Sequence, residues 1–174
     1  SGKLSMSFPY CVGQCPVYYN EYTTGRPFRE GDNNRFLSKY LDIPNKPLYP
    51  FGFGLSYTTF SYEPVVCDKK EIGDKEKLTV SAVVKNTGKR EGTEVVQLYI
   101  QDVIASVVRP VKELKQFKKV TLKPSEAQNV SFEIDASMLE FLRADGTEGT
   151  EPGEFRVWIG GSSDTQNVDS FQLK

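Results

Sequence analysis

The sequence predicts an all-β protein in which residues 55–174 form an antiparallel β-sandwich of two sheets. Three observations predict this architecture. From about Leu55 onwards, short runs of β-branched and aromatic residues recur, and several of them alternate apolar and polar side chains with a period of two. Residues typical of turns separate the runs. No stretch of this part shows the 3.6-residue apolar repeat of an amphipathic helix.

Taken in chain order, seven or eight of these runs are expected to be strands. They lie at residues 56–62, 78–84, 93–103, 111–122, 130–134, 139–142, 155–159 and 171–173. The core strands are expected at residues 78–84, 95–100, 130–134 and 155–159. In the second of these, Val96, Leu98 and Ile100 alternate with polar or aromatic residues and should face the core.

The two long runs in the middle of the chain carry the most specific expectations. Gln97 and Tyr99 occupy the alternate positions and should face away from the core. Residues 111–122 lose strict alternation between Leu114 and Phe117, which predicts a bulge or bend between them.

Residues 1–54 have a different character, because they are irregular and rich in Pro, Gly, Asn and Tyr. A structureless segment of this length is unusual inside a compact domain. Its aromatic residues are too many for a solvated linker: Phe8, Tyr10, Tyr18, Tyr19, Tyr22, Phe28, Phe36, Tyr40, Tyr49, Phe51 and Phe53. We therefore expect residues 1–54 to lie across another part of the protein. Without that part, the exposed apolar surface should favour self-association.

Five motifs follow one another in an order and spacing that resemble one known family. They stand at residues 12–27, 47–60, 92–100, 109–117 and 152–163. Residues 47–54, for example, read Pro-Leu-Tyr-Pro-Phe-Gly-Phe-Gly, and residues 92–100 read Gly-Thr-Glu-Val-Val-Gln-Leu-Tyr-Ile. Together the motifs resemble the C-terminal part of the family 3 glycoside hydrolases of the β-glucosidase type. Cys15 departs from the pattern, because the family more often has an aliphatic residue there.

The resemblance implies a division of the chain into two parts. Residues 1–54 would be the C-terminal tail of a second α/β domain and a linker, and residues 55–174 a fibronectin type III-like, immunoglobulin-like β-sandwich. The Cys…Trp…Cys pattern of antibody domains is absent, because Cys67 lies outside the expected core strands and Trp158 comes late. A fibronectin-type sandwich therefore fits better than an antibody-type one.

The resemblance also implies a function: a non-catalytic, C-terminal region of an enzyme that hydrolyses O-glycosidic bonds. Retaining glycosidases need two carboxyl groups about 5 Å apart, one a nucleophile and one an acid/base. In the family both lie in the preceding domains. We therefore expect no catalytic residue in this chain and no activity of the chain alone. Its partners would be the missing catalytic domains, and carbohydrate substrate would be met only through the whole enzyme.

The chain's own polar residues point to no other catalytic site. It has no histidine, which excludes Ser-His-Asp and Cys-His constellations. Three acidic pairs lie close in sequence: Glu30 with Asp32, Asp145 with Glu148, and Glu151 with Glu154. The pairs lie in a loop or beside glycine turns, so solvated turns are the expected role.

Tyr99 and Trp158 are the candidates for a binding role, since sugars are commonly held by aromatic faces. Both are expected on the side of the sheet away from the core. The favoured interpretation is that they pack against the second domain or cover a sheet edge. The alternative is an accessible aromatic strip on a free-standing module that binds carbohydrate or protein.

Composition excludes several other classes of function. The formal net charge is −1 and basic residues are interspersed with acidic ones, which argues against nucleic-acid binding. No apolar run is long enough to span a membrane. No phosphate-binding glycine loop is present, so no cofactor is expected.

The three cysteines are expected to be free thiols. A closed zinc site needs four ligands, and without histidine it would have to recruit Cys67 and a carboxylate in addition to Cys11 and Cys15. We therefore expect no metal, although a bridge between Cys11 and Cys15 is open if their loop is tight. The odd cysteine count favours a reducing compartment, and hence a cytoplasmic over a periplasmic or secreted location.

Overall fold

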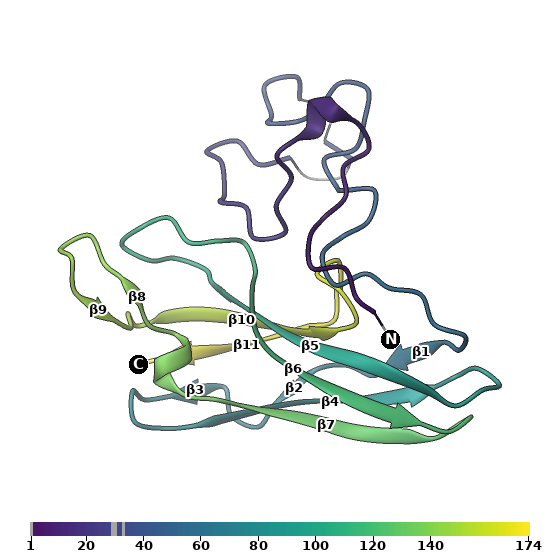
Figure 1. Cartoon of the computed structure of the whole chain (residues 1–174). Coiled ribbons are helices and arrows are strands. Elements are labelled where there is room, and N and C mark those ends of the chain that lie inside the picture. Colours follow the sequence, from purple (N-terminus) through teal and green to yellow (C-terminus); the bar gives the residue numbers. More distant parts are fainter. Residues whose placement is uncertain (1, 29–30, 33) are drawn as a thin grey trace.

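The computed structural model describes residues 2–28, 31, 32 and 34–174. Across this part of the chain the structure is all-β, with eleven strands and two short 3₁₀ turns. Two sheets pack face to face, and the described part of residues 2–54 stands on the outer side of one of them (Figure 1). The expected sandwich class is therefore confirmed.

The first sheet is built around β4 (Leu78–Asn86). One edge of β4 pairs with β7 (Ala127–Ile134), and the other pairs with β1 (Phe60–Tyr62) and β2 (Val66–Cys67). All these pairs are antiparallel.

The second sheet has five strands in the order β3-β11-β10-β5-β6. Their bounds are Glu71–Ile72 for β3, Val168–Leu173 for β11, Gly153–Gly160 for β10, Gly92–Asp102 for β5 and Glu113–Leu122 for β6. The β3–β11 pair is parallel and the others are antiparallel. A hairpin of β8 (Phe141–Leu142) and β9 (Glu148–Gly149) stands apart, and the 3₁₀ turns are η1 (Val12–Gln14) and η2 (Ala136–Met138).

The core lies between the two sheets and contains the residues that the alternation predicted. Val96, Leu98 and Ile100 of β5 are at most 2% exposed and belong to one apolar cluster with the inward residues of the other sheet. Phe155 and Phe171 stack in this cluster, with ring centroids 5.4 Å apart. Burial of such side chains stabilises a sandwich by about 1.5–3 kcal/mol each.

The expected bulge in residues 111–122 is confirmed. The β5–β6 register shifts between Leu98 and Tyr99, which pair with Gln116 and Leu114. Lys115 is therefore the extra residue, and it lies between the two residues at which the alternation breaks. The bulge changes the face to which the start of β6 directs its side chains.

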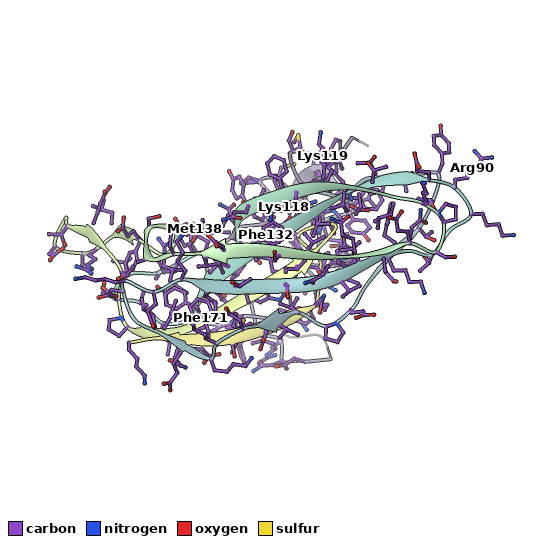
Figure 2. The ribbon with its side chains drawn as sticks, turned by 90° about the horizontal axis from the view of Figure 1, so that it is seen from below. Arg90, Lys118, Lys119, Phe132, Met138 and Phe171 are labelled. Carbon is purple, nitrogen blue, oxygen red and sulfur yellow. The ribbon has the colours of Figure 1, made fainter. Side chains whose placement is uncertain are left out.

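The open edges of β6 and β7 are joined by side chains rather than by backbone pairing. Gln116 Nε2 donates to the backbone oxygen of Glu133 at 2.8 Å, and Lys118 Nζ donates to that of Ser131. Figure 2 shows Lys118 next to Phe132, and its Nζ lies 5.1 Å from the ring centroid. These contacts cover carbonyl groups that an edge strand would otherwise expose.

The expectations differ from the structure where elements are short. Strands β2, β3 and β9 have only two residues each, too few for a readable alternation. No strand is expected between residues 62 and 78, but β2 and β3 lie there, and Cys67 of β2 is 5% exposed. The run at 139–142 forms a strand only over β8, because η2 precedes it.

Candidate interdomain contact site

Tyr99 and Trp158 lie directly opposite each other on neighbouring strands of the second sheet. Tyr99 of β5 pairs with Trp158 of β10, and both rings are on the side away from the core cluster. Tyr99 is 0% exposed and Trp158 is 9% exposed. The prediction that both residues face away from the core is therefore confirmed, but their rings are covered by other parts of the same chain.

Tyr19 of the first segment, the described part of residues 2–54, contacts Tyr99. The ring of Tyr19 stacks on Phe51 with centroids 4.2 Å apart and meets Tyr99 edge-on at 5.9 Å. The Tyr19 hydroxyl accepts a hydrogen bond of 3.3 Å from the Leu114 backbone N–H. Aromatic pairs in this geometry contribute about 0.5–1.5 kcal/mol beyond the area they bury.

Gln97 links the sheet to the first segment through its amide. Its Oε1 accepts a hydrogen bond from the Tyr99 hydroxyl, and its Nε2 donates to the carbonyl oxygens of Gly161 at 2.7 Å and Gly52 at 3.4 Å. Gly52 has φ of +77°, and a Cβ there would lie 2.3 Å from Gln97 Oε1. Only glycine fits this close approach.

Lys112 is half-buried, and its Nζ lies 4.6 Å from the centroid of the Trp158 ring and 5.9 Å from that of Tyr99. It donates to the backbone oxygens of Ser163 at 2.9 Å and Thr165 at 3.1 Å, in the turn between β10 and β11. Burial lowers the pKa of Lys112 to about 8, although the nearby Asp164 carboxylate favours the charged form.

The same turn holds the first segment at two further points. The Ser163 backbone N–H donates to the Phe51 oxygen at 2.9 Å. Lys3 Nζ donates to the Gly161 oxygen at 3.0 Å and lies 2.8 Å from Glu94 Oε1, a carboxylate that is 8% exposed. We call the contact formed by Tyr19, Phe51, Gln97, Tyr99, Lys112 and Trp158 the segment–sheet contact.

The first segment also carries many exposed apolar side chains. Those at least 40% exposed are Met6, Phe8, Tyr10, Val12, Tyr18, Tyr22, Phe36, Tyr40, Leu41, Leu48 and Tyr49. Leu41 is 97% and Val12 88% exposed. An apolar surface of this kind is typical of an interface. We call the segment two-sided, because some of its residues contact the sandwich and others expose apolar side chains.

The chain matches known proteins along nearly its whole length. Its residues 94–163 match the fibronectin type III-like domain. It is 50% identical over 173 residues to a periplasmic β-glucosidase of Salmonella typhimurium, with 99% of this chain and 23% of that protein covered. It is 45% identical over 172 residues to a β-xylosidase of Formosa agariphila, again with 99% of this chain and 23% of that protein covered.

The crystal structure of the Listeria innocua β-glucosidase in complex with isofagomine superposes with a TM-score of 0.92 at 46% identity, covering 99% of this chain and 24% of that one. The chain corresponds to the C-terminal region of the family 3 β-glucosidases.

This family 3 region spans about a quarter of the length of the relatives that it matches. The expected resemblance is thereby confirmed, and the relatives are multidomain proteins of which this chain covers one part.

Within the part of the chain that the structure describes, no helix is long and apolar enough to cross a bilayer.

Of the acidic pairs in this family 3 region, Asp145 lies in a turn, whereas Glu148 and Glu154 lie in strands β9 and β10. Asp145 accepts hydrogen bonds from the Thr147 N–H at 2.9 Å and hydroxyl at 2.7 Å, and these lower its pKa. Glu151 accepts from Ser106, and Glu30 lies outside the described residues. Among the described residues, no three His, Cys, Asp or Glu side chains lie close enough to hold a metal ion together.

The sequence did not indicate Gln97 and Lys112 as parts of a site. Gln97 lies two residues before Tyr99 and therefore on the same face of the strand, which is the one feature of the sequence that could have indicated its role. Lys112 stood within a basic stretch that is typical of a solvated strand face. Its burial depends on the turn at residues 161–165, which is distant in sequence.

Proposed function

We propose that this chain is the non-catalytic C-terminal region of a β-glucosidase-like glycoside hydrolase and that it stabilises the catalytic domains. In this proposal the whole enzyme hydrolyses O-glycosidic bonds with two carboxyl groups that lie in the rest of the polypeptide. The close relatives with β-glucosidase and β-xylosidase names, each about four times as long as this chain, support this assignment.

The observation that carries the proposal is the two-sided first segment. Some of its residues are fixed by the segment–sheet contact, and others expose aromatic and aliphatic side chains. A chain that crosses from one domain to the next has this form, since it must bury side chains against both. In this proposal Tyr99 and Trp158 contribute to the interdomain contact only indirectly. They hold the first segment in place, and the first segment contacts the catalytic domains.

Rigid support of this kind has a clear use in catalysis. Two carboxyl groups must be held at a defined separation, and a catalytic site is only as well ordered as the elements that support it. The alternative, a free-standing sugar-binding module, is less well supported. Tyr99 and Trp158, which would form its aromatic strip, have exposed fractions of only 0% and 9%.

The test uses the longer polypeptide encoded by the gene and an aryl β-glucoside as substrate. Replacing Lys112 with Met should shorten the half-life of activity at elevated temperature severalfold and leave KM unchanged, because support is weakened and the sugar site is untouched. The exposed Lys119 supplies the control Lys119→Met, which should behave as wild type. Removal of residues 55–174 without any change in that half-life would contradict the proposal.

A further inference from the structure

A second site lies at the end of β5, where two buried polar atoms have no partner among the described residues. Asp102 is the last residue of β5 and is 7% exposed, and its Oδ2 accepts no hydrogen bond there. Arg109 donates through Nη2 to Glu113 at 2.9 Å, but its buried Nε has no acceptor in the described part. Buried polar atoms are rarely left unpaired, because each costs about 1–3 kcal/mol.

A cavity of about 450 Å³ opens between these groups and the first segment. Its walls are the loop that runs from Asp102 to Arg109 on one side and Thr23, Thr24 and Gly25 on the other. Figure 1 shows this loop extending from the end of β5, beside the β8–β9 hairpin. The cavity is thus built from both parts of the chain.

The loop is held by contacts with residues of the β8–β9 hairpin and the segment that follows it. The backbone N–H and the hydroxyl of Ser106 donate to the Glu151 carboxylate at 2.8 and 2.5 Å. The Arg109 guanidinium lies 4.6 Å from the centroid of the Phe141 ring, on β8. A site that is already formed loses little conformational entropy when it is filled.

The rim of the cavity is apolar and exposed. Ile104 is 80% and Val108 is 64% exposed, although both belong to this ordered loop. Aliphatic side chains around a few buried hydrogen-bonding groups are typical of the centre of a protein–protein interface.

We propose that the loop between β5 and β6, residues 103–112, is a docking surface for the part of the polypeptide that precedes this chain in its longer relatives. That part presents a hydrogen-bond donor to Asp102 Oδ2 and an acceptor to Arg109 Nε. A peptide group or a carboxamide side chain supplies both, whereas a lone cation or anion would satisfy only one. The inference rests on the proposed function and adds to it a second contact, on the sandwich itself.

The length of the relatives argues for this occupant over others. The chain matches 23% of the Salmonella typhimurium protein, so about three quarters of such a polypeptide is available to fill the cavity. In the proposed function the exposed apolar residues of the first segment contact the same part of the polypeptide. Thr23–Gly25 of this segment also line the cavity.

Hydrogen–deuterium exchange on the 174-residue chain and on the longer polypeptide tests the inference. The backbone amides of residues 104–108 should exchange at least tenfold more slowly in the longer form. Asp102→Asn in the longer form replaces one of the two accepting carboxylate oxygens with an NH2 group that donates, and it should abolish most of that slowing of exchange. Glu140→Gln is the matched control, because Glu140 is exposed, and it should keep the protection.

The other outcomes separate this inference from the proposed function. If the outer side of the first segment becomes protected in the longer form while residues 104–108 do not, the loop is no docking surface and the proposed function stands. If neither becomes protected, both are wrong. If glucose or xylose alone slows exchange of the loop in the 174-residue chain, the cavity takes a small sugar and the docking inference is overturned.

Discussion

The ammonium group of Lys112 lies 4.6 Å from the centroid of the Trp158 ring and donates to two carbonyl oxygens of the turn after β10. One residue therefore connects the loop before β6, an aromatic ring of the sheet and the turn that also binds Phe51. The position of the first segment depends on this turn. The half-buried Lys112 amine thus supports the segment–sheet contact from the sandwich side.

Replacing Lys112 with Met should lower the free energy of unfolding by about 1–2 kcal/mol. The variant keeps most of the side-chain volume but leaves the Ser163 and Thr165 oxygens without their donor and removes the cation–π contact. Thermal denaturation of the 174-residue chain measures the change. Lys119→Met should leave the midpoint within a degree of wild type, and an equal effect of both variants would contradict the assignment.

Gly52→Ala should detach the first segment from the sheet. The new methyl group would have to occupy the space of Gln97 Oε1, and alanine disfavours the φ of +77°. We expect faster tryptic cleavage within residues 2–54, followed by fragment mass. Gly25→Ala is the control, because nothing lies within 4 Å of its Cβ position. Unchanged cleavage in Gly52→Ala would show that Gln97 can move aside without cost.

The stability of the 174-residue chain should depend on the charge of Asp102. Burial raises the pKa of Asp102 to about 6, with Arg109 opposing the rise and Glu151 adding to it. The folded chain therefore binds this proton more tightly than the unfolded chain, where the pKa is about 3.9. The carboxylate lowers stability at neutral pH, and this penalty disappears as the pH falls from about 6 to about 4.

Thermal midpoints of wild type and Asp102→Asn at several pH values measure this effect. The variant should be more stable at pH 7, and the difference should shrink towards zero at pH 4, where the wild-type group is itself uncharged. A difference of the same size at both pH values would exclude titration of Asp102 as its cause.

The isolated chain should self-associate through the bare side of its first segment. Val12, Leu41 and Tyr18 are among the most exposed apolar residues there, with exposed fractions of 88%, 97% and 62%. Sedimentation velocity should show a sedimentation coefficient that rises with concentration, and Leu41→Ser with Tyr18→Ser should reduce the rise. Val66→Ser, on the opposite sheet, should not. A monomer at all concentrations would contradict this prediction.

Strand positions and faces could be predicted where alternation is long. Val96, Leu98 and Ile100 define the core face of β5, and the position of Tyr99 on the other face follows from the same pattern. The break in alternation likewise predicted a bulge or bend between Leu114 and Phe117, where the structure has the bulge at Lys115. Strands of two residues such as β2 carry no period, so Cys67 could not be placed.

The contacts of the site could not be predicted in the same way. The contact of Tyr19 with Tyr99, and the stacking of Phe51 on Tyr19, depend on how an irregular segment folds back, and no periodic pattern encodes that path. The burial of Lys112 depends on a turn formed by residues far along the chain. Local sequence can indicate which residues need a partner, but the partner itself comes from the tertiary fold.

Hydrolysis of an aryl β-glucoside by the purified 174-residue chain, beside the longer polypeptide from the same gene, tests the central claim most directly. We predict steady turnover by the longer polypeptide and a rate no different from buffer for the chain alone, since in the proposed function the chain supplies support and not the reacting carboxyl groups. Turnover by the pure chain at a rate near that of the longer polypeptide would contradict the account.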